Sequence, residues 1–290
     1  MFASMIRILA VLLLCLTAVV GCNQSNNAEV AKEKTRADAA EAELARANAR
    51  ADKAEGELAK LKVAQPQPKA VEADRRAAEW VLRVDGSVRI VVDGASLDVK
   101  ASEKLPEGDL KLVSITVYSP KATNDGLDYL QGLEHLREFR FNYDTGITTF
   151  DFLAEMSNLE LLVYGSRWGS ISDKDFAHLK RLTKLKTLDL SSFFGNENVT
   201  DAGLEQLKDL KQLQMLSVIK LNITDAGLQH LKQHPALKDL YLQNTKITDA
   251  GLEHLKGLSN LEALHLEETK VTDAGVKSLQ EALPKCKITK

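Results

Sequence analysis

A hexapeptide of the form Ile/Val-Thr-Asp-Ala-Gly-Leu recurs in the second half of the chain and constrains its fold more than any other feature. Copies lie at Val199–Leu204, Ile223–Leu228 and Ile247–Leu252, and a fourth, ending in valine, lies at Val271–Val276. The four copies begin 24 residues apart, and self-similarity at a fixed spacing of roughly 20–50 residues is the sequence signature of a solenoid. The chain is therefore predicted to fold as a stack of similar units.

Between the hexapeptides lie apolar triplets of the pattern Leu-x-x-Leu-x-Leu. The clear copies are Leu213/Leu216/Val218, Leu237/Leu240/Leu242 and Leu261/Leu264/Leu266. Weaker copies upstream are Leu112/Ile115/Val117, Leu136/Phe139/Phe141, Leu159/Leu162/Tyr164 and Leu185/Leu188/Leu190. The stack is thus predicted to hold seven repeats over residues 112–290, and Leu283/Cys286/Ile288 fits an eighth strand that closes it.

Each repeat has the chemistry of a strand, a turn and a short helix. Alternate residues of a strand face the same way, so two leucines point into the core and the residues between them face solvent. Threonine is predicted to be the N-cap of the helix that follows, at Thr200, Thr224, Thr248 and Thr272. The next aspartate places negative charge at the positive end of that helix. The small residues Ala250 and Gly251 suggest that neighbouring repeats approach closely there.

The pattern L-x-x-L-x-L-x-x-T-x-I-T-D-A-G-L resembles the leucine-rich repeat, in the subclass whose helices begin with T-D-x-G-L, as in F-box adaptor repeats and many bacterial proteins. The resemblance implies an α/β solenoid with parallel strands on its concave face and short helices on its convex face. The chain departs from the commonest repeats in three ways. Thr245 and Thr269 replace the usual asparagine, the loops Gly165–Ser170 and Ser191–Asn198 are long, and the second repeat lacks a helical turn before Met156.

The first 21 residues have the character of a signal peptide. Arg7 gives a positive start, and Ile8–Val20 is an apolar run shorter than a bilayer span. The run leads into Cys22 in a sequence that resembles the bacterial lipobox, which implies cleavage before Cys22 and lipidation of its sulfur. Residues 22–27 would then form a lipidated tether, and Asn23 favours the outer membrane; an uncleaved anchor is the alternative. The expected location is the cell envelope, in the outer membrane, the periplasm or at the cell surface.

Residues 28–62 are rich in Ala, Glu, Lys and Arg, and their alanines and leucines alternate in spacings of three and four. That spacing predicts a coiled-coil helix. Because alanine buries little area, association through it would give only a weak homo-oligomer, and a single charged stalk is the alternative. Residues 63–71 contain Pro66 and Pro68 and are predicted to be a linker. Residues 72–111 are predicted to form a helix and a hairpin that cap the first repeat, with Trp80 in the cap core.

Cysteine usage leaves one thiol in the folded part of the chain. Cys15 would leave with the signal, Cys22 would carry lipid, and Cys286 sits at an inward-facing strand position. No intramolecular disulfide is then available, and Cys286 is interpreted as a small core hydrophobe.

Catalytic motifs are missing from the sequence, which contains no G-x-S-x-G, P-loop, H-E-x-x-H or C-x-x-C pattern. The repeated aspartates are explained by their helix starts. His178, His230 and His254 share one slot of the repeat but lack a third ligand, so we interpret them as exposed helix residues rather than a metal site. A net charge of −3 without a basic stripe argues against nucleic acid. The prediction is a protein that is not an enzyme and that holds no cofactor or metal.

Function then depends on the exposed face of the strands, where partners usually dock in this architecture. That face is predicted to be polar with a few aromatics, which suits a protein or peptide partner. The candidate partner-binding residues on the strands and in the loops are Arg140, Asn142, Asp189, Tyr241, Gln243, His265, Glu267, Trp168, Phe193 and Phe194. Whether Phe193 projects outward or folds back onto the strands is left open. The leading hypothesis is a lipid-tethered binding module. The alternatives are an envelope spacer that works through residues 28–62, and a non-catalytic subunit that targets an enzyme.

Overall fold

A computed structural model of the chain describes residues 70–141, 145–165 and 171–290. The predicted signal peptide, the tether with Cys22, the coiled coil of residues 28–62 and the linker up to residue 69 lie outside these residues, as do Asn142 and Trp168. Among the described residues, no helix combines the length and apolar character needed to cross a membrane.

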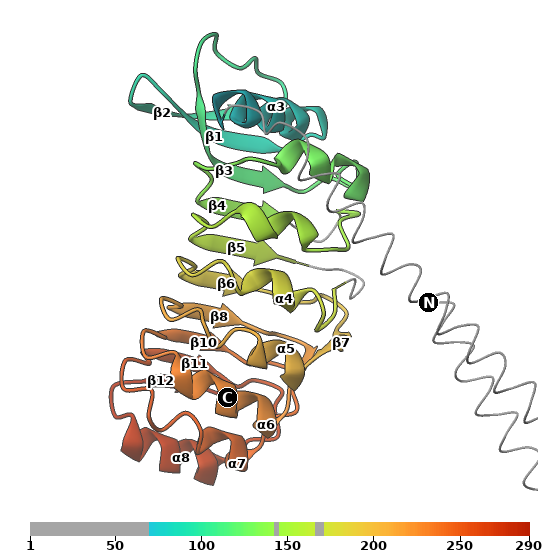
Figure 1. Cartoon of the computed structure of the whole chain (residues 1–290). Coiled ribbons are helices and arrows are strands. Elements are labelled where there is room, and N and C mark those ends of the chain that lie inside the picture. The colour runs from blue at the N-terminus through green and yellow to red at the C-terminus, as the bar shows by residue number, and fades with distance from the viewer. Residues whose placement is uncertain (1–69, 142–144, 166–170) are drawn as a thin grey trace, which may run out of the picture. The chain divides into compact units, whose positions relative to one another are not determined.

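The repeats build one sheet of ten strands. Eight of its strands are parallel: β3 (Lys111–Val117), β4 (Glu138–Phe141), β5 (Leu161–Tyr164), β6 (Thr187–Asp189), β8 (Met215–Ser217), β10 (Asp239–Tyr241), β11 (Ala263–His265) and β12 (Lys287–Thr289). Each pairs with the next without slipping register, so Leu216 lies beside Leu240 and Leu240 beside Leu264. This confirms the predicted solenoid of parallel strands (Figure 1).

The leucines of the repeat form the core. The three positions of each triplet are at most 2% exposed in the seven predicted repeats. The predicted closing triplet is out of register, because Ile288 of β12 pairs with Leu264, whereas Leu283 and Cys286 lie before β12, although both are buried. The early repeats fill the same positions with aromatic rings, and Phe139 packs against Phe141 with ring centroids 4.0 Å apart. Because no single repeat could bury its own leucines, the repeats are stable only when stacked.

Short helices connect the strands and line up along one side of the stack in Figure 1. The α-helices are α4 (Phe176–Leu179), α5 (Asp201–Glu205), α6 (Asp225–Leu228), α7 (Asp249–Leu252) and α8 (Asp273–Ala282). The 3-10 helices are η1 (Asn124–Leu130), η2 (Asp151–Glu155) and η3 (Gln229–Gln233). The second repeat, expected to lack a helical turn before Met156, keeps the tighter 3-10 helix η2 there.

The cap consists of α3 (Ala70–Arg83), β1 (Ser87–Val92) and β2 (Ala95–Lys100). The helix begins at Ala70, so the last two residues of the predicted linker are helical. Strand β1 pairs antiparallel with both β2 and β3, which extends the sheet past the first repeat. Trp80 is 4% exposed and stacks on Tyr129 of η1, so it belongs to the core.

Asp74 attaches α3 to the first two repeats. Its carboxylate is fully buried, accepts a hydrogen bond from the Leu112 N–H at 3.1 Å and lies 2.7 Å from His135 Nδ1. Burial raises the pKa of this carboxyl, against the opposing effect of these two contacts. A buried carboxylate of this kind depends on its partners, since removing one leaves the other unsatisfied.

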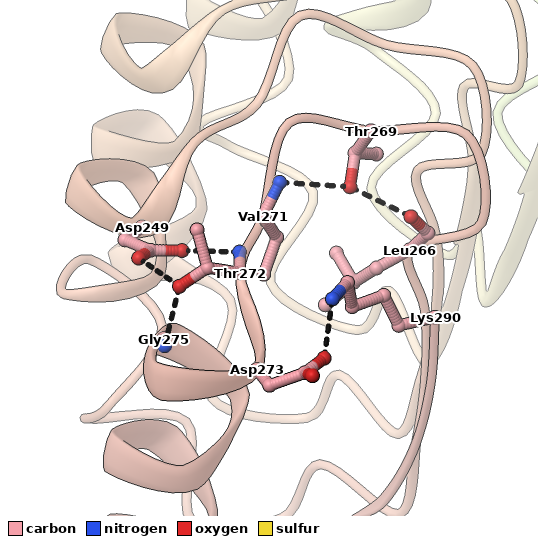
Figure 2. A network of polar contacts seen from close by, with 8 residues as sticks. All are labelled: Asp249, Leu266, Thr269, Val271, Thr272, Asp273, Gly275 and Lys290. Atoms are coloured by element: carbon pink, nitrogen blue, oxygen red, sulfur yellow. Dashed lines mark hydrogen bonds and ion pairs between the residues drawn. The ribbon is translucent and has the colours of Figure 1, made fainter.

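A ladder of threonine–aspartate contacts joins consecutive helix starts. The carboxylate of Asp249 accepts hydrogen bonds from the N–H and the hydroxyl of Thr272, 24 residues after Thr248, at 2.7 and 2.6 Å (Figure 2). Equivalent pairs join Asp173 to Thr200, Asp201 to Thr224 and Asp225 to Thr248. The aspartates therefore bind the next repeat, which corrects the interpretation that they serve only their own helix start.

The threonines of the ladder also act at their own helices. The hydroxyl oxygen of Thr248 accepts from the Ala250 N–H at 3.3 Å, and that of Thr272 accepts from the Gly275 N–H at 3.3 Å. Each hydroxyl thus donates to the preceding repeat and accepts from its own helix. Gly251 is small because a Cβ there would overlap the Asp225 carboxylate, whereas Ala250 is exposed and meets no such neighbour.

Thr245 and Thr269 do not form a ladder of their own. The hydroxyl of Thr269 donates to the Leu266 carbonyl at 2.6 Å, within the same repeat (Figure 2). Thr245 makes the same bond to Leu242. These residues close local turns after the strands. They stand where the commonest repeats have asparagine, but their hydroxyls bond within one repeat and not from one repeat to the next.

The end of the long loop Ser191–Asn198 is not irregular. Its last residues belong to β7 (Asn196–Thr200), which pairs in parallel with β9 (Leu221–Asn222) and forms a separate two-stranded sheet. The Asn196 N–H donates to the Lys220 carbonyl at 3.0 Å. The loop is therefore fixed to the next repeat at its base.

Candidate functional site

The solvent-facing residues of the parallel strands form one continuous surface, which we call the concave face. It is defined by one residue of each strand, the next-to-last of β3, β4 and β5 and the last of β6, β8, β10, β11 and β12: Thr116, Arg140, Val163, Asp189, Ser217, Tyr241, His265 and Thr289. Of these, Ser217 is buried. In-register pairing places each of these side chains beside its equivalent in the next repeat. Arg140 and His265 are separated by five strand spacings, or about 24 Å at about 4.8 Å per spacing.

A charged cluster occupies the cap end of the concave face. Arg140 is half-buried and contacts Glu138 at 2.7 Å, and Arg89 of β1 contacts Asp98 of β2 at 2.7 Å. The hydrogen bond from Arg89 lowers the pKa of Asp98 below its ordinary value. Together with Ser87, Val88, Lys100, Ser114 and Thr116, these four residues line a hollow of about 400 Å³.

The cap residues of this cluster were missed by sequence reasoning, which treated the cap only as a cover for the core. The pairing of β1 with β3 makes the outward residues of the hairpin an extension of the concave face. The alternating polar residues Arg89 and Asp98 within an apolar hairpin were the available signal.

An aromatic stack lies toward the other end of the concave face. The rings of Tyr241 and His265 are parallel within 6°, with centroids 4.5 Å apart. His265 Nδ1 lies 2.9 Å from the Thr289 hydroxyl and 3.7 Å from the Glu267 carboxylate. Desolvation acts to raise the pKa of Glu267, but hydrogen bonding from Thr289 and the nearby His265 outweigh it, so the pKa lies below its ordinary value. The stack is therefore fixed in place beside an ionised carboxylate.

Gln243 and Glu267 occupy equivalent positions just after β10 and β11. The N–H of Asn244 donates to the Glu267 carbonyl at 3.0 Å, so the backbone pairing continues past the strands. Both side chains are partly exposed and border the Tyr241–His265 stack. Asp189, by contrast, accepts from the Ser191 N–H at 3.0 Å and helps to close the turn after β6.

Phe193 and Phe194 project outward. Their side chains are 52% and 61% exposed and pack edge to face, with ring centroids 4.8 Å apart. Lys220 holds the pair: its ammonium donates to the Phe193 carbonyl at 2.9 Å and lies 5.6 Å from the centre of the Phe193 ring. The alternative in which Phe193 folds back onto the strands is therefore wrong.

The two phenylalanines form one wall of a second hollow, of about 660 Å³, at the edge where the strands end. Its other lining residues are Gly195, Asn196, Glu197, Lys220, Leu221, Asn222, Asn244, Thr245, Lys246 and Glu268. Exposed aromatic side chains in a hollow are typical of a contact site for another protein. Sequence reasoning had not identified Lys220 and Lys246.

The remaining titratable groups of the described residues do not gather into a catalytic or metal-binding cluster. His178 contacts Asp151 at 2.9 Å, and His230 and His254 are partly exposed. Within residues 70–141, 145–165 and 171–290 there is no cluster of three His, Cys, Asp or Glu side chains suited to a metal. Burial raises the pKa of the Cys286 thiol to about 11, so it stays protonated at neutral pH.

Similarity to known proteins agrees with this geometry. A family described as Leucine Rich repeat matches residues 257–279. ATP synthase subunit s, mitochondrial, from Homo sapiens is 32% identical over 162 residues, which are 52% of this chain and 80% of that protein; the Pongo abelii protein of the same name matches equally. The chain belongs to the leucine-rich repeat family.

Two solved structures from Listeria monocytogenes also resemble this leucine-rich repeat chain. An internalin (inlF) is 26% identical with a TM-score of 0.47, and the match covers 58% of this chain and 44% of that one. An internalin C2 (inlC2) is 19% identical with a TM-score of 0.47, and the match covers 78% and 99%. The match therefore spans less than half of the inlF structure.

Proposed function

We propose that this leucine-rich repeat protein is a non-catalytic module that binds a protein or peptide partner along its concave face, while a lipid on Cys22 tethers it to the cell envelope. The observation that carries the proposal is the spread of contact groups along one surface. The Arg140 cluster and the Tyr241–His265 stack lie about 24 Å apart by strand spacing. An extended partner reaches both, whereas a small substrate does not.

The character of the groups supports the same proposal. Tyrosine, histidine, arginine and phenylalanine dominate the candidate positions, and aromatic and arginine side chains contribute most of the binding energy at protein interfaces. The relative from Homo sapiens is named as a subunit of ATP synthase, and a subunit is a component of a larger assembly. Docking onto other proteins is consistent with such a role.

The binding surface is tested by capture of partners from membranes that contain the full chain. Tyr241→Ala with His265→Ala, and separately Phe193→Ala with Phe194→Ala, are expected to reduce the recovered partner at least tenfold. Gln229→Ala with Lys232→Ala, at exposed positions of η3, is the matched control and should leave recovery unchanged. Equal recovery from all variants would place the partner elsewhere.

The tether has its own test. Cys22→Ala should abolish incorporation of labelled palmitate and release the protein from membranes, whereas Cys286→Ala should change neither. Membrane association that persists in Cys22→Ala would point to an uncleaved anchor, and a parent chain that incorporates no label would refute lipidation.

The spacer alternative predicts a different pattern. If residues 28–62 carry the function, their deletion abolishes it, whereas substitutions on the concave face do not matter. The two proposals are separated by comparing that deletion with Tyr241→Ala and His265→Ala in the same functional assay.

A further inference from the structure

The outer edge of β2 ends the ten-stranded sheet at the cap. Among the described residues, β2 pairs with β1 alone, and its six residues make it twice as long as β12, which ends the sheet on the other side. Figure 1 places β2 at the cap end of the stack, away from the repeats. An unpaired edge strand presents free N–H and carbonyl groups to any strand that can align with it.

The residues whose backbone faces outward follow from the hairpin. Asp93 and Gly94 form a two-residue turn with positive φ at both positions, so the flanking pair Val92–Ala95 exchanges backbone hydrogen bonds. In an antiparallel pair, hydrogen-bonded and non-hydrogen-bonded residue pairs alternate. Ala95, Leu97 and Val99 therefore bond β1, whereas the N–H and carbonyl groups of Ser96, Asp98 and Lys100 point away from β1.

Lys100 supports this assignment independently. Its N–H donates to the Glu103 carboxylate at 2.8 Å, and its carbonyl accepts from the Glu103 N–H at 2.8 Å. Both groups therefore point away from β1, as the alternation requires. Ser96 and Asp98 are left as the outward-facing residues of the edge.

Leu97 lies midway between them and is exposed. It pairs with Ile90, which is fully buried, so its side chain belongs to the core face of the sheet; yet 44% of it reaches solvent. It is one of four exposed large hydrophobic side chains in the described part of the chain.

We propose that two copies of this protein pair through their β2 strands, antiparallel and centred on Leu97. In this register Ser96 of each copy faces Asp98 of the other, and the outward backbone groups form four hydrogen bonds. The two Leu97 residues become a non-hydrogen-bonded pair with Cα atoms about 4.5 Å apart, and their exposed side chains cover each other. A second copy is the occupant because the edge is self-complementary about one residue, as a two-fold interface requires.

Disulfide trapping of the full chain tests the register. In a Leu97→Cys variant the two thiols lie within the range that a disulfide spans, so mild oxidation should yield a covalent dimer. In a Ser96→Cys variant, on the same strand, the thiols are displaced by two residues, roughly 8 Å between Cα atoms. We expect at least tenfold more dimer from Leu97→Cys than from Ser96→Cys or from the unsubstituted chain. Equal yields would overturn the proposal.

Sedimentation of the full chain in detergent tests the association without cysteines. Leu97→Lys places like charges on the two-fold axis and should convert dimer to monomer, with an unchanged circular dichroism spectrum to show that the fold is intact. A parent chain that is monomeric at micromolar concentration would refute the proposal. A dimer that survives Leu97→Lys would refute it as well and would place the association elsewhere, for example in residues 28–62.

Discussion

His234 occupies a position where neighbouring repeats have leucine. Leu210 and Leu258 are buried there, and His234 is also fully buried. Its Nε2 lies 2.9 Å from the Leu207 carbonyl, but its Nδ1 has no hydrogen-bond partner among the described residues. An unsatisfied buried polar atom costs about 1–3 kcal/mol.

Replacement of this histidine should stabilise the protein. Leucine has a similar volume, and the Leu207 carbonyl still accepts from the Leu210 N–H at 2.9 Å. His234→Leu is expected to raise the free energy of unfolding by about 1 kcal/mol at pH 7.5, measured by urea titration. A loss of stability would mean that the ring makes contacts that leucine cannot replace.

The same residue gives stability a pH dependence. Burial lowers the pKa of His234 in the folded state below its ordinary value of 6.5. As pH falls below that value the unfolded chain binds the proton first, so stability is present at higher pH and decreases toward acid. The stability gap between His234→Leu and the parent should therefore widen from pH 7.5 to pH 5.5. A gap that stays constant would show that the imidazole is protonated equally in both states.

Cys286 should be unreactive in the folded protein. Its thiol is 3% exposed and its pKa is raised to about 11 by burial, so little thiolate forms at pH 8. Iodoacetamide should label the Cys286 peptide, detected by mass spectrometry, only after unfolding in denaturant. Rapid labelling of the native chain would contradict the burial of Cys286.

At the scale of single elements, the aspartate ladder should stabilise the contact between repeats. Asp225→Ala removes two charge-assisted hydrogen bonds to Thr248 and is expected to cost about 2 kcal/mol. Asp273 is the matched control, because its carboxylate is 97% exposed and contacts Lys290 rather than a threonine of the ladder (Figure 2). Asp273→Ala should leave the midpoint of thermal unfolding nearly unchanged.

A conservative variant separates geometry from charge. In the first repeat, Asn124 Oδ1 accepts from the Thr148 N–H at 2.9 Å, and Asn124 Nδ2 donates to the Thr148 hydroxyl at 2.8 Å, so an amide can hold the same two groups with the hydroxyl bond reversed. Asp225→Asn should therefore retain more stability than Asp225→Ala. If Asp225→Asn and Asp225→Ala lose the same free energy of unfolding, the stabilisation comes from the charge of the carboxylate and not from its hydrogen-bond geometry.

Gly251 and Asp225 should be energetically coupled. A Cβ on Gly251 would overlap the Asp225 carboxylate, which Thr248 holds in place, so Gly251→Ala alone is expected to destabilise α7. In the Asp225→Ala background the same substitution should cost less, because the overlap with the carboxylate is gone and alanine favours helix over glycine, although an Ile247 methyl carbon still lies 3.2 Å from the added Cβ. Gly257→Ala, where no atom lies within 4 Å of the added Cβ, is the control. If the changes in the free energy of unfolding from the two single substitutions add up to that of the double variant, the two residues do not interact and the predicted overlap is excluded.

The repeat elements could be predicted because burial has a period that is visible in the sequence. Leu216, Leu240 and Leu264 recur on a fixed spacing, and only stacking keeps all of them dry. The contact of the aspartates with the next repeat could not be predicted. An aspartate at a helix start is already explained by the positive end of its own helix, and the threonine that it binds comes close only when the repeats stack. The exposure of Phe193 could not be predicted either, because the loop that carries it belongs to one repeat alone and leads into the β7–β9 pair, which has no sequence period. The roles of Cys22, Asn142, Trp168 and residues 28–62 stay predictions.

At the scale of the whole molecule, the described elements of the stack contact mainly their neighbours in adjacent layers. In such a chain, stability is a sum over repeats and their interfaces, and damage at one end need not unfold the other. The cap and the C-terminal repeats are suited to a test because different residues hold them. Asp74 fixes α3 to the first two repeats, and the ladder from Asp173 to Thr272 fixes the later ones.

Asp74→Ala should therefore loosen one end of the molecule. It leaves the Leu112 N–H and His135 without the buried carboxylate, at a cost of about 3 kcal/mol. Hydrogen exchange measured by mass spectrometry should speed up in residues 70–141 and stay at the parent rate in residues 225–290. Asp225→Ala should give the reverse pattern, with faster exchange on both sides of α6 and an unchanged cap. Uniform acceleration in both variants would mean that the stack unfolds as one cooperative unit, so that the concave face could not yield locally to a partner without the loss of the whole fold.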